Sequence, residues 1–285
     1  MPTYAPFLDP TNPILRGNPQ SVILCVSPIT GADWWDLSPK QQAPSIQAGQ
    51  PRLKGTTASV KGLGFDFTGG AKEVRYASRS SYPSDQSSAL TVIVVARPDQ
   101  ATGTFINKGE QTDSNSAFVF GTADSIGTPV LCLNAPGSGP FTSTLAMTSK
   151  TWGVAGVSQT SATVRTFAVN NGFNGVVKTQ ATSGNSGSGS IGASQPWSLG
   201  RSWINSAVDT ASDLNGGLAF VLVLNRAVST AELISLCLDP FQVIAQAPQR
   251  GPLWLVPDRP PATVTPGGFK AAWASNSRVL TGGIV

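Results

Sequence analysis

SLGRSWINSAVDTASDLNGGLAFVLVLNRAVSTAELISLCLDPF, residues Ser198 to Phe241, is the stretch that decides the fold of this chain. Its central run, Leu218 to Leu224, is apolar throughout, is too short to span a membrane, and predicts a strand buried on both faces. Ser229-Thr230-Ala231-Glu232 follows with the spacing of a capping box, in which Ser229 and Glu232 cap each other's backbone N–H groups. The sequence therefore predicts a short helix over Thr230 to Leu238 that Asp239-Pro240 ends.

The composition favours many short strands over long helices. The 285 residues include 30 glycines and 22 prolines, and only 12% are charged. The chain has no histidine, which removes Ser–His and Cys–His nucleophile pairs, imidazole metal ligands and the commonest general base. The net charge is +4 without any run of Lys or Arg, so no nucleic-acid groove is expected.

The cysteines and the N-terminus bear on the cellular compartment. Cys25, Cys132 and Cys237 lie far apart, each in or beside an apolar segment, and an odd number without C-x-x-C spacing predicts buried free thiols. MPTYAPFLDP has neither a basic region nor an apolar core of the kind found in signal peptides. We expect no signal peptide and no membrane segment, and folding in a reducing cytoplasm.

Further strands are expected wherever short alternating or apolar runs lie between turn residues. These runs are Ser21 to Ser27, Lys61 to Gly70, Ser88 to Pro98, Thr104 to Glu110, Ser116 to Thr122, Pro129 to Ala135, Thr151 to Gln159 and Ala162 to Gly172. The side chains expected in the core are Trp152, Phe167, Leu222 and Leu224.

The order of these parts resembles a laminin-G-like (concanavalin A-like) jelly roll. Gly200-Arg201, the long strand Gly216 to Ser229 and the helical turn Thr230 to Leu236 are similar to the end of that fold. Ser88 to Pro98 is similar to its "ftveawvrp" strand, and Thr151 to Gln159 to its "wHhvagtydg" strand without the histidine. The resemblance implies an all-β, two-sheet antiparallel jelly-roll sandwich over residues 21–241, with one short helix and extended N- and C-terminal arms.

Three residues near the predicted sheet edges are candidates for ligand contact. Trp34 and Trp35 precede an Asp36-Leu37-Ser38 triplet that looks like the opening of such jelly rolls. Adjacent residues on a strand point to opposite faces, so one tryptophan is a candidate for glycan stacking, or else covers the sandwich edge or contacts a subunit. The family sometimes carries Ca²⁺, which makes Asp66 a candidate ligand, but no second carboxylate supports it and no cofactor is assigned.

Both ends of the chain are rich in proline. Residues 1–20 contain five prolines and predict an extended N-terminal arm, either a flexible leader or an arm docked on a neighbouring subunit. Residues 242–285 predict a Pro-rich C-terminal strap that carries +3 of the net +4 charge, with a solvated tail or a self-packed edge strand as the alternatives. The candidate partner-binding residues in this strap are Trp254, Trp273, Arg250, Arg259, Lys270 and Arg278.

Two strings near the C-terminus are similar to laminin-G-like proteins of tailed bacteriophages: Asp239 to Val243, beside "NPwQl", and Ala271 to Ser277, beside "aaWa.nsn". This resemblance implies a structural virion protein, either a capsid decoration or reinforcement protein or a head or tail appendage, docking through its arms. Its partners would be other virion subunits and further copies of itself. Its location would be the virion surface, after synthesis in the host cytoplasm.

The sequence offers no pair of carboxylates for acid–base catalysis. Glycosidases built on this sandwich place two or three carboxylates on one strand, whereas Glu73, Glu110 and Glu232 share no predicted strand with a second carboxylate. Asp36 is expected to be a turn or capping residue. We therefore expect a protein that is not an enzyme, with a carbohydrate-binding module that recognises a host surface glycan as the alternative to a purely structural role.

Overall fold

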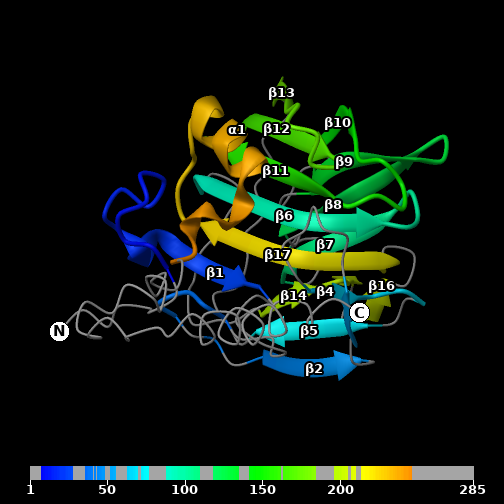
Figure 1. Ribbon diagram of the computed structural model, residues 1–285. Coiled ribbons are helices and arrows are strands. Elements are labelled where there is room, and N and C mark those ends of the chain that lie inside the picture. The colour runs from blue at the N-terminus through cyan, green and yellow to red at the C-terminus, as the bar shows by residue number, and fades with distance from the viewer. Residues whose placement is uncertain are drawn as a thin grey trace, which may run out of the picture. The chain divides into compact units, whose positions relative to one another are not determined.

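Two large antiparallel sheets, a two-stranded ribbon and one α-helix form the described part of the computed structural model, which confirms the predicted all-β sandwich (Figure 1). The structure describes residues 8–27, 36–40, 42, 44–48, 52–55, 63–69, 72–76, 88–109, 118–134, 141–161, 163–183, 196–204, 207–209 and 213–245.

The first sheet contains eight of the described strands. In spatial order these are β13 (Lys178–Ser183), β12 (Val164–Asn171), β11 (Gly153–Gln159), β6 (Leu90–Pro98), β17 (Gly216–Leu224), β4 (Leu63–Asp66) and β3 (Arg52–Gly55), with β1 (Val22–Val26) also pairing with β17.

The second sheet contains seven of the described strands. In spatial order these are β10 (Phe141–Ala146), β9 (Thr128–Asn134), β8 (Phe118–Ser125), β7 (Gly103–Lys108), β14 (Trp197–Leu199), β5 (Glu73–Tyr76) and β2 (Pro44–Ala48). The remaining elements are the ribbon β15 (Ser202–Ile204) and β16 (Ala207–Asp209), the helix α1 (Thr230–Leu238), and the 3₁₀ turns η1 (Pro19–Ser21) and η4 (Pro240–Val243).

Strand β17 lies inside the first sheet and is buried along its whole length, as its continuous apolar sequence predicts. It pairs with β6, where Leu222 faces Ile93, and with β1, where Leu222 faces Cys25. Successive side chains point to opposite faces of a strand, so Val221 and Val223 pack between the sheets while Leu222 packs on the outer face. The outer face of this sheet therefore needs a cover.

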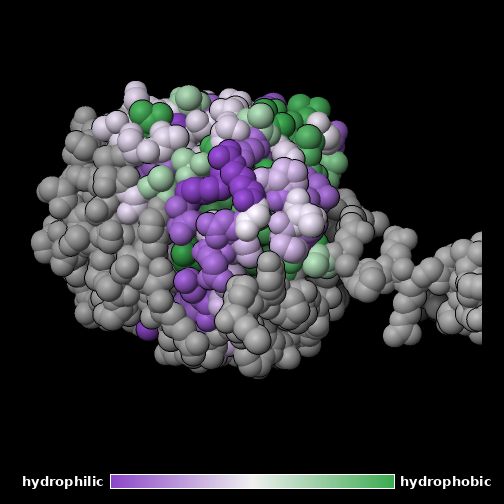
Figure 2. All heavy atoms as spheres, turned by 90° about the vertical axis from the view of Figure 1, so that its left-hand side faces the viewer, coloured by the Kyte–Doolittle hydropathy of each residue, from purple (hydrophilic) through white to green (hydrophobic). Residues whose placement is uncertain are grey.

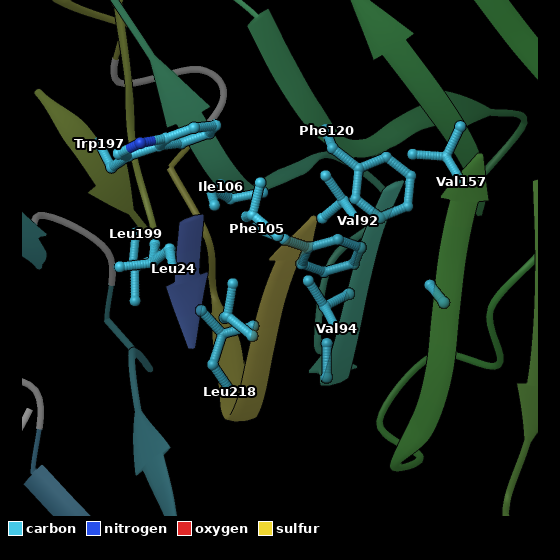
Figure 3. Close-up of a cluster of buried hydrophobic side chains, with 14 of the residues drawn as sticks. Leu24, Val92, Val94, Phe105, Ile106, Phe120, Val157, Trp197, Leu199 and Leu218 are labelled. Carbon is cyan, nitrogen blue, oxygen red and sulfur yellow. The ribbon is translucent and has the colours of Figure 1, made fainter. Parts of the chain in front are cut away.

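The space between the sheets is filled by aromatic and branched side chains (Figure 3). Phe105 and Phe120 meet edge to face with ring centres 6.0 Å apart, and Phe118 meets Trp197 in the same way at 6.2 Å. Phe167 is buried in this cluster, as predicted. Phe65 and Phe67 also share this face, which confirms the alternation expected around Asp66.

The cover of the first sheet is α1 together with η4 and the N-terminal turns. Leu233, Leu236 and Cys237 of α1 pack against β11 and β12 in a second apolar cluster that includes Trp152, Leu222 and Leu224. Gly156 leaves room under the helix, because a Cβ there would lie 2.7 Å from Ile93 Cδ1 and 3.1 Å from Leu233 Cδ1, and these side-chain ends would have to move. The predicted core residues are thus all buried, but they belong to two clusters on either side of one sheet.

The helix has the predicted bounds and the predicted cap. Ser229 Oγ accepts the N–H of Glu232, and Glu232 Oε2 accepts the N–H of Ser229 at 2.7 Å, which is a complete capping box. Asp239 follows as the C-cap, and its side chain accepts the N–H of Phe241 at the start of η4. The local sequence alone therefore determines both helix ends.

Residues 8–20 lie as turns against the body of this chain. Leu8 forms an isolated bridge with Ile244, and Asn12 Nδ2 donates to the carbonyl oxygen of Gln242 at 2.8 Å. Leu8, Ile14 and Leu15 are buried in the cluster that covers the first sheet. The described part of the predicted N-terminal arm thus contacts the chain's own closing helix and turn.

This end of the sandwich has a polar surface. Figure 2 shows a hydrophilic band on the face that lies to the left in Figure 1. Arg16 Nη2 lies 3.0 Å from Glu232 Oε1, and Arg226 Nη2 lies 3.1 Å from the same oxygen. One carboxylate therefore joins the N-terminal turns, the residues that follow β17 and the start of α1.

All three thiols are free, as predicted. Cys25 and Cys237 are buried, whereas Cys132 is half-buried because its neighbours Leu131 and Leu133 turn inward and leave it on the outer face of the second sheet. No helix among the described residues is long and apolar enough to cross a membrane.

Candidate functional site

Apart from Asp66, the ligand and partner residues predicted from the sequence lie outside the described residues. This applies to Trp34 and Trp35 and to the strap residues Arg250, Trp254, Arg259, Lys270, Trp273 and Arg278. Their roles stay predictions, as does the boundary between the sandwich and the strap. The described residues nevertheless show where polar and charged side chains lie together in the sandwich itself.

The described carboxylates are bound to groups of the chain. Asp36 is buried, and its carboxylate accepts the backbone N–H groups of Cys25 at 3.0 Å, Ser38 at 2.9 Å and Gln42 at 3.0 Å. Burial raises the pKa of Asp36, while these hydrogen bonds act in the opposite direction. Asp36 therefore holds a turn together, which is the role the sequence indicated.

The Gly-Arg pair that opens the closing segment has a structural role as well. Arg201 Nε and Nη2 each donate to the Asp213 carboxylate at 2.6 Å, which ties the end of β14 to the residues that precede β17. Nearby, Arg75 Nε lies 2.6 Å from the buried carboxylate of Glu73. Asp66 accepts the N–H of Thr68 in a local turn, and no group of three metal-ligating acids or thiols occurs among the described residues.

One cation of the sandwich differs from all of these. Arg165 of β12 points between the sheets, and its side chain has no exposed surface. Its Nε donates to Gln159 Oε1 at 2.8 Å, and its guanidinium carbon lies 3.5 Å from the ring centre of Phe141. Nη1 and Nη2 have no hydrogen-bond partner in the described part of the chain. Burial lowers the pKa of Arg165 to about 10, which leaves it charged at neutral pH.

The surroundings of Arg165 join the two sheets at their edges. Phe141 begins β10, the last strand of the second sheet, and Thr182 of β13, the last strand of the first sheet, pairs with Arg165. Gln180 Oε1 accepts both the N–H and the hydroxyl of Thr144, at 2.7 Å and 2.9 Å, and so connects the two strands, which lie at the top of the sandwich (Figure 1).

We name Phe141, Gln159, Arg165 and Thr182 the edge cluster. Thr182 Oγ1 is buried and, like the two arginine nitrogens, has no partner in the described part of the chain. Three possible donors that have no acceptor among the described residues, Arg165 Nη1 and Nη2 and Thr182 Oγ1, thus meet beside an aromatic ring. The arrangement can bind an anion or a polar group with two acceptor oxygens.

Arg165 could have been found from the sequence, because it is a charged residue in the inward register of its strand. In ATVRTFAVNNG, residues 162–172, Arg165 alternates with Phe167 and Val169, which are the inward side chains. A charged residue in an inward register is unusual enough to mark a site. Its proximity to Phe141 and Thr182 depends on sheet pairing and is not visible in the sequence.

No family model matches this sequence, and no curated protein matches it. The laminin-G-like resemblance therefore stays a hypothesis, whereas the sandwich itself is similar to solved structures of low identity.

Three of these structures are an arabinanase domain, a neurotoxin binding domain and a phage tailspike domain. Domain 4 of AbnA, an extracellular GH43 arabinanase from Geobacillus stearothermophilus in complex with arabinotriose, matches with a TM-score of 0.54 and 15% identity, over 76% of this chain and 98% of that chain. The binding domain of botulinum neurotoxin DC in complex with rat synaptotagmin II matches with a TM-score of 0.54 and 9% identity, over 79% and 52%. The enzymatically active domain of tailspike protein 2 of bacteriophage CBA120 matches with 0.51 and 13%, over 70% and 31%. At these identities the similarity is one of fold.

Proposed function

We propose that this chain is a glycan-recognising β-sandwich that works on the surface of a tailed-phage virion. The observation that carries the proposal is the edge cluster, in which donors without a partner among the described residues lie beside an aromatic ring at the rim of the sandwich. Binding sites for polar ligands combine apolar or aromatic walls with a few well-placed polar groups. The similarity to an arabinanase domain bound to arabinotriose, along 98% of that domain, supports the choice of a glycan.

A purely structural virion role is the second candidate. The tailspike domain with the same fold supports an attachment to a phage particle, and the Pro-rich strap is suited to lying along a partner subunit. Both roles are compatible, since one surface can bind a glycan while another docks on the particle. Fold alone does not separate them.

We further propose that the chain does not hydrolyse its ligand. It contains no histidine, and its described glutamates, Glu73 and Glu232, are held in ion pairs with arginines. Incubation with polysaccharides and ester substrates should release no product. Turnover that disappears in Glu73→Gln, Glu110→Gln or Glu232→Gln protein would contradict this.

The test of glycan recognition uses the full chain. We expect saturable binding to at least one bacterial surface polysaccharide or plant arabinan in a set of neutral and acidic glycans, with competition by the matching soluble oligosaccharide. Absence of binding across the whole set would refute glycan recognition.

The test of the structural role is cryo-electron microscopy of native phage particles purified from cells that produce the chain. Ordered, symmetric copies on the capsid or the tail, contacting other subunits, would support the second candidate. A particle that lacks the chain altogether would refute the virion assignment and leave glycan recognition to its own test.

A further inference from the structure

We propose that the edge cluster binds the carboxylate group of an acidic sugar. The inference rests on the proposed glycan recognition and names the class of glycan that this site selects. Arg165 is the residue that would contact the ligand through its charge, and Thr182 the residue that would add a neutral hydrogen bond.

The state of Arg165 indicates that a partner from outside the chain completes the site. A buried charge is costly unless it is paired and hydrogen-bonded. Its described contacts are a neutral amide, Gln159, and the face of the Phe141 ring, and no described carboxylate reaches it. An apolar residue of similar length would fit the same inward position among Phe167 and Val169. An arginine at this position therefore contributes to binding an anion and not to packing.

The geometry favours a carboxylate. Nε of Arg165 already donates to Gln159. The two nitrogens at the end of the guanidinium, Nη1 and Nη2, lie side by side and have no partner among the described residues, so both can donate to a ligand. Two parallel N–H donors match the two oxygens of a planar carboxylate. Thr182 is paired with Arg165 across β12 and β13, and its buried hydroxyl can donate to one of the same oxygens. In the chain without ligand, the Phe141 ring covers the guanidinium, whose carbon lies 3.5 Å from the ring centre.

The position at the sheet edges suits a ligand that is mostly outside. Phe141 is the first residue of β10, an edge strand, and β13, which carries Thr182, is an edge strand with exposed residues at both ends. Only the carboxylate of a sugar acid would need to reach Arg165, while the sugar ring stays outside the two sheet edges. Because Phe141 is buried over the guanidinium, entry of the carboxylate would require the Phe141 side chain to rotate away, a movement that needs no change in the backbone.

The experiment compares ligand-induced thermal stabilisation and calorimetric affinity in the full chain. The probes are sodium D-glucuronate and sodium N-acetylneuraminate, with D-glucose as the neutral control and sodium phosphate and sodium acetate as simple anions at equal ionic strength. The variants are Arg165→Met and Thr182→Val. Lys178→Met is the matched control, because it removes an exposed cation from β13, the strand that pairs with β12 and carries Thr182.

We expect the two sugar acids, but not glucose, to raise the melting temperature of the wild-type chain. Arg165→Met should abolish this effect and leave the melting temperature without ligand unchanged or higher, because an unpaired buried charge is gone. Thr182→Val should weaken the affinity about tenfold, the loss of one hydrogen bond to a charged group. Lys178→Met should bind like the wild type.

Several results would overturn the inference. Equal stabilisation of Arg165→Met and wild type would show that the sugar acids bind elsewhere. A melting temperature of Arg165→Met far below that of the wild type would show a structural role for Arg165, and Thr182→Val with unchanged affinity would contradict the site independently of Arg165. An equal shift with phosphate or acetate would show a general anion site. Neutral glycans that bind wild type and Arg165→Met alike would refute the acidic-sugar assignment while glycan recognition stands.

Discussion

Glu232 is the residue through which three separate parts of the chain meet, and its removal is the sharpest test of the fold. Its Oε2 accepts the N–H of Ser229 at 2.7 Å, and its Oε1 lies 3.0 Å from Arg16 and 3.1 Å from Arg226. Arg226 also donates to the carbonyl oxygen of Ile14. A substitution at Glu232 therefore removes half of a helix cap and two ion pairs together.

The magnitude follows from these contacts. We expect Glu232→Ala to lower the free energy of unfolding by about 2 kcal/mol, with about 1 kcal/mol from the cap and about 0.5 kcal/mol from each partly exposed ion pair. Glu232→Gln keeps an oxygen for the Ser229 N–H but has no charge, so its loss should be about 1 kcal/mol. Urea denaturation at pH 7, followed by tryptophan fluorescence, measures both values.

The same carboxylate predicts an acid-dependent loss of stability. Partial burial raises the pKa of Glu232, but hydrogen bonds from Ser229, Arg226 and Arg16 outweigh this and lower the pKa from 4.5 to about 2. A pKa that is lower in the folded than in the unfolded state contributes stability above pH 4.5, and that stability is lost as the pH falls from 4.5 towards 2. Glu232→Gln should lack this part of the pH dependence.

Two results would refute the reasoning about Glu232. A Glu232→Ala protein within about 0.5 kcal/mol of the wild type at pH 7 would show that the cap and the ion pairs contribute little. Parallel pH dependence of wild type and Glu232→Gln between pH 4.5 and 2 would show that the carboxylate titrates normally in the folded chain.

Further predictions concern packing and thiol reactivity. Trp152→Ala should cost about 3–5 kcal/mol in the free energy of unfolding because its ring is buried against the first sheet, and an unchanged melting temperature would contradict this. Gly217→Ala should cost about 1–3 kcal/mol, since its Cβ would lie 2.6 Å from the Trp152 ring, and should cost far less in the Trp152→Ala background; additive losses in urea denaturation would show that the ring is not the obstacle. Burial raises the pKa of Cys132 to about 11 and that of Cys237 to about 12, so mass spectrometry after iodoacetamide treatment at pH 8 should find slow labelling of half-buried Cys132 and labelling of Cys237 only after denaturation. Rapid labelling of Cys237 in the native chain would contradict its burial.

The structure at the closing segment was predictable because the decisive interactions are local. The capping box joins residues three apart, and the proline after Asp239 ends the helix wherever the segment lies. The apolar run from Leu218 to Leu224 has no polar side chain for solvent, so a strand formed by it has to be covered on both faces. Composition and turn residues then predicted the all-β class and the short strands around it.

The sequence by itself thus determined the long apolar strands such as β6, β11 and β17, where the helix begins and ends, and which side chains are apolar enough to be buried. It did not predict the short or polar strands, among them β10 and β13. Only the tertiary structure decided which core each buried residue joins, because Leu222 and Val221 separate to opposite faces once β17 lies between β6 and β1. It also decided that residues 8–20 pack on the chain itself, through a bridge between Leu8 and Ile244 that spans almost the whole described sequence. The edge cluster is the clearest case: alternation turns Arg165 inward, but Phe141 comes to lie over its guanidinium only because β10 and β13 end their sheets at the same edge. Contacts between residues far apart in the chain depend on strand order and register, which local residue patterns do not encode.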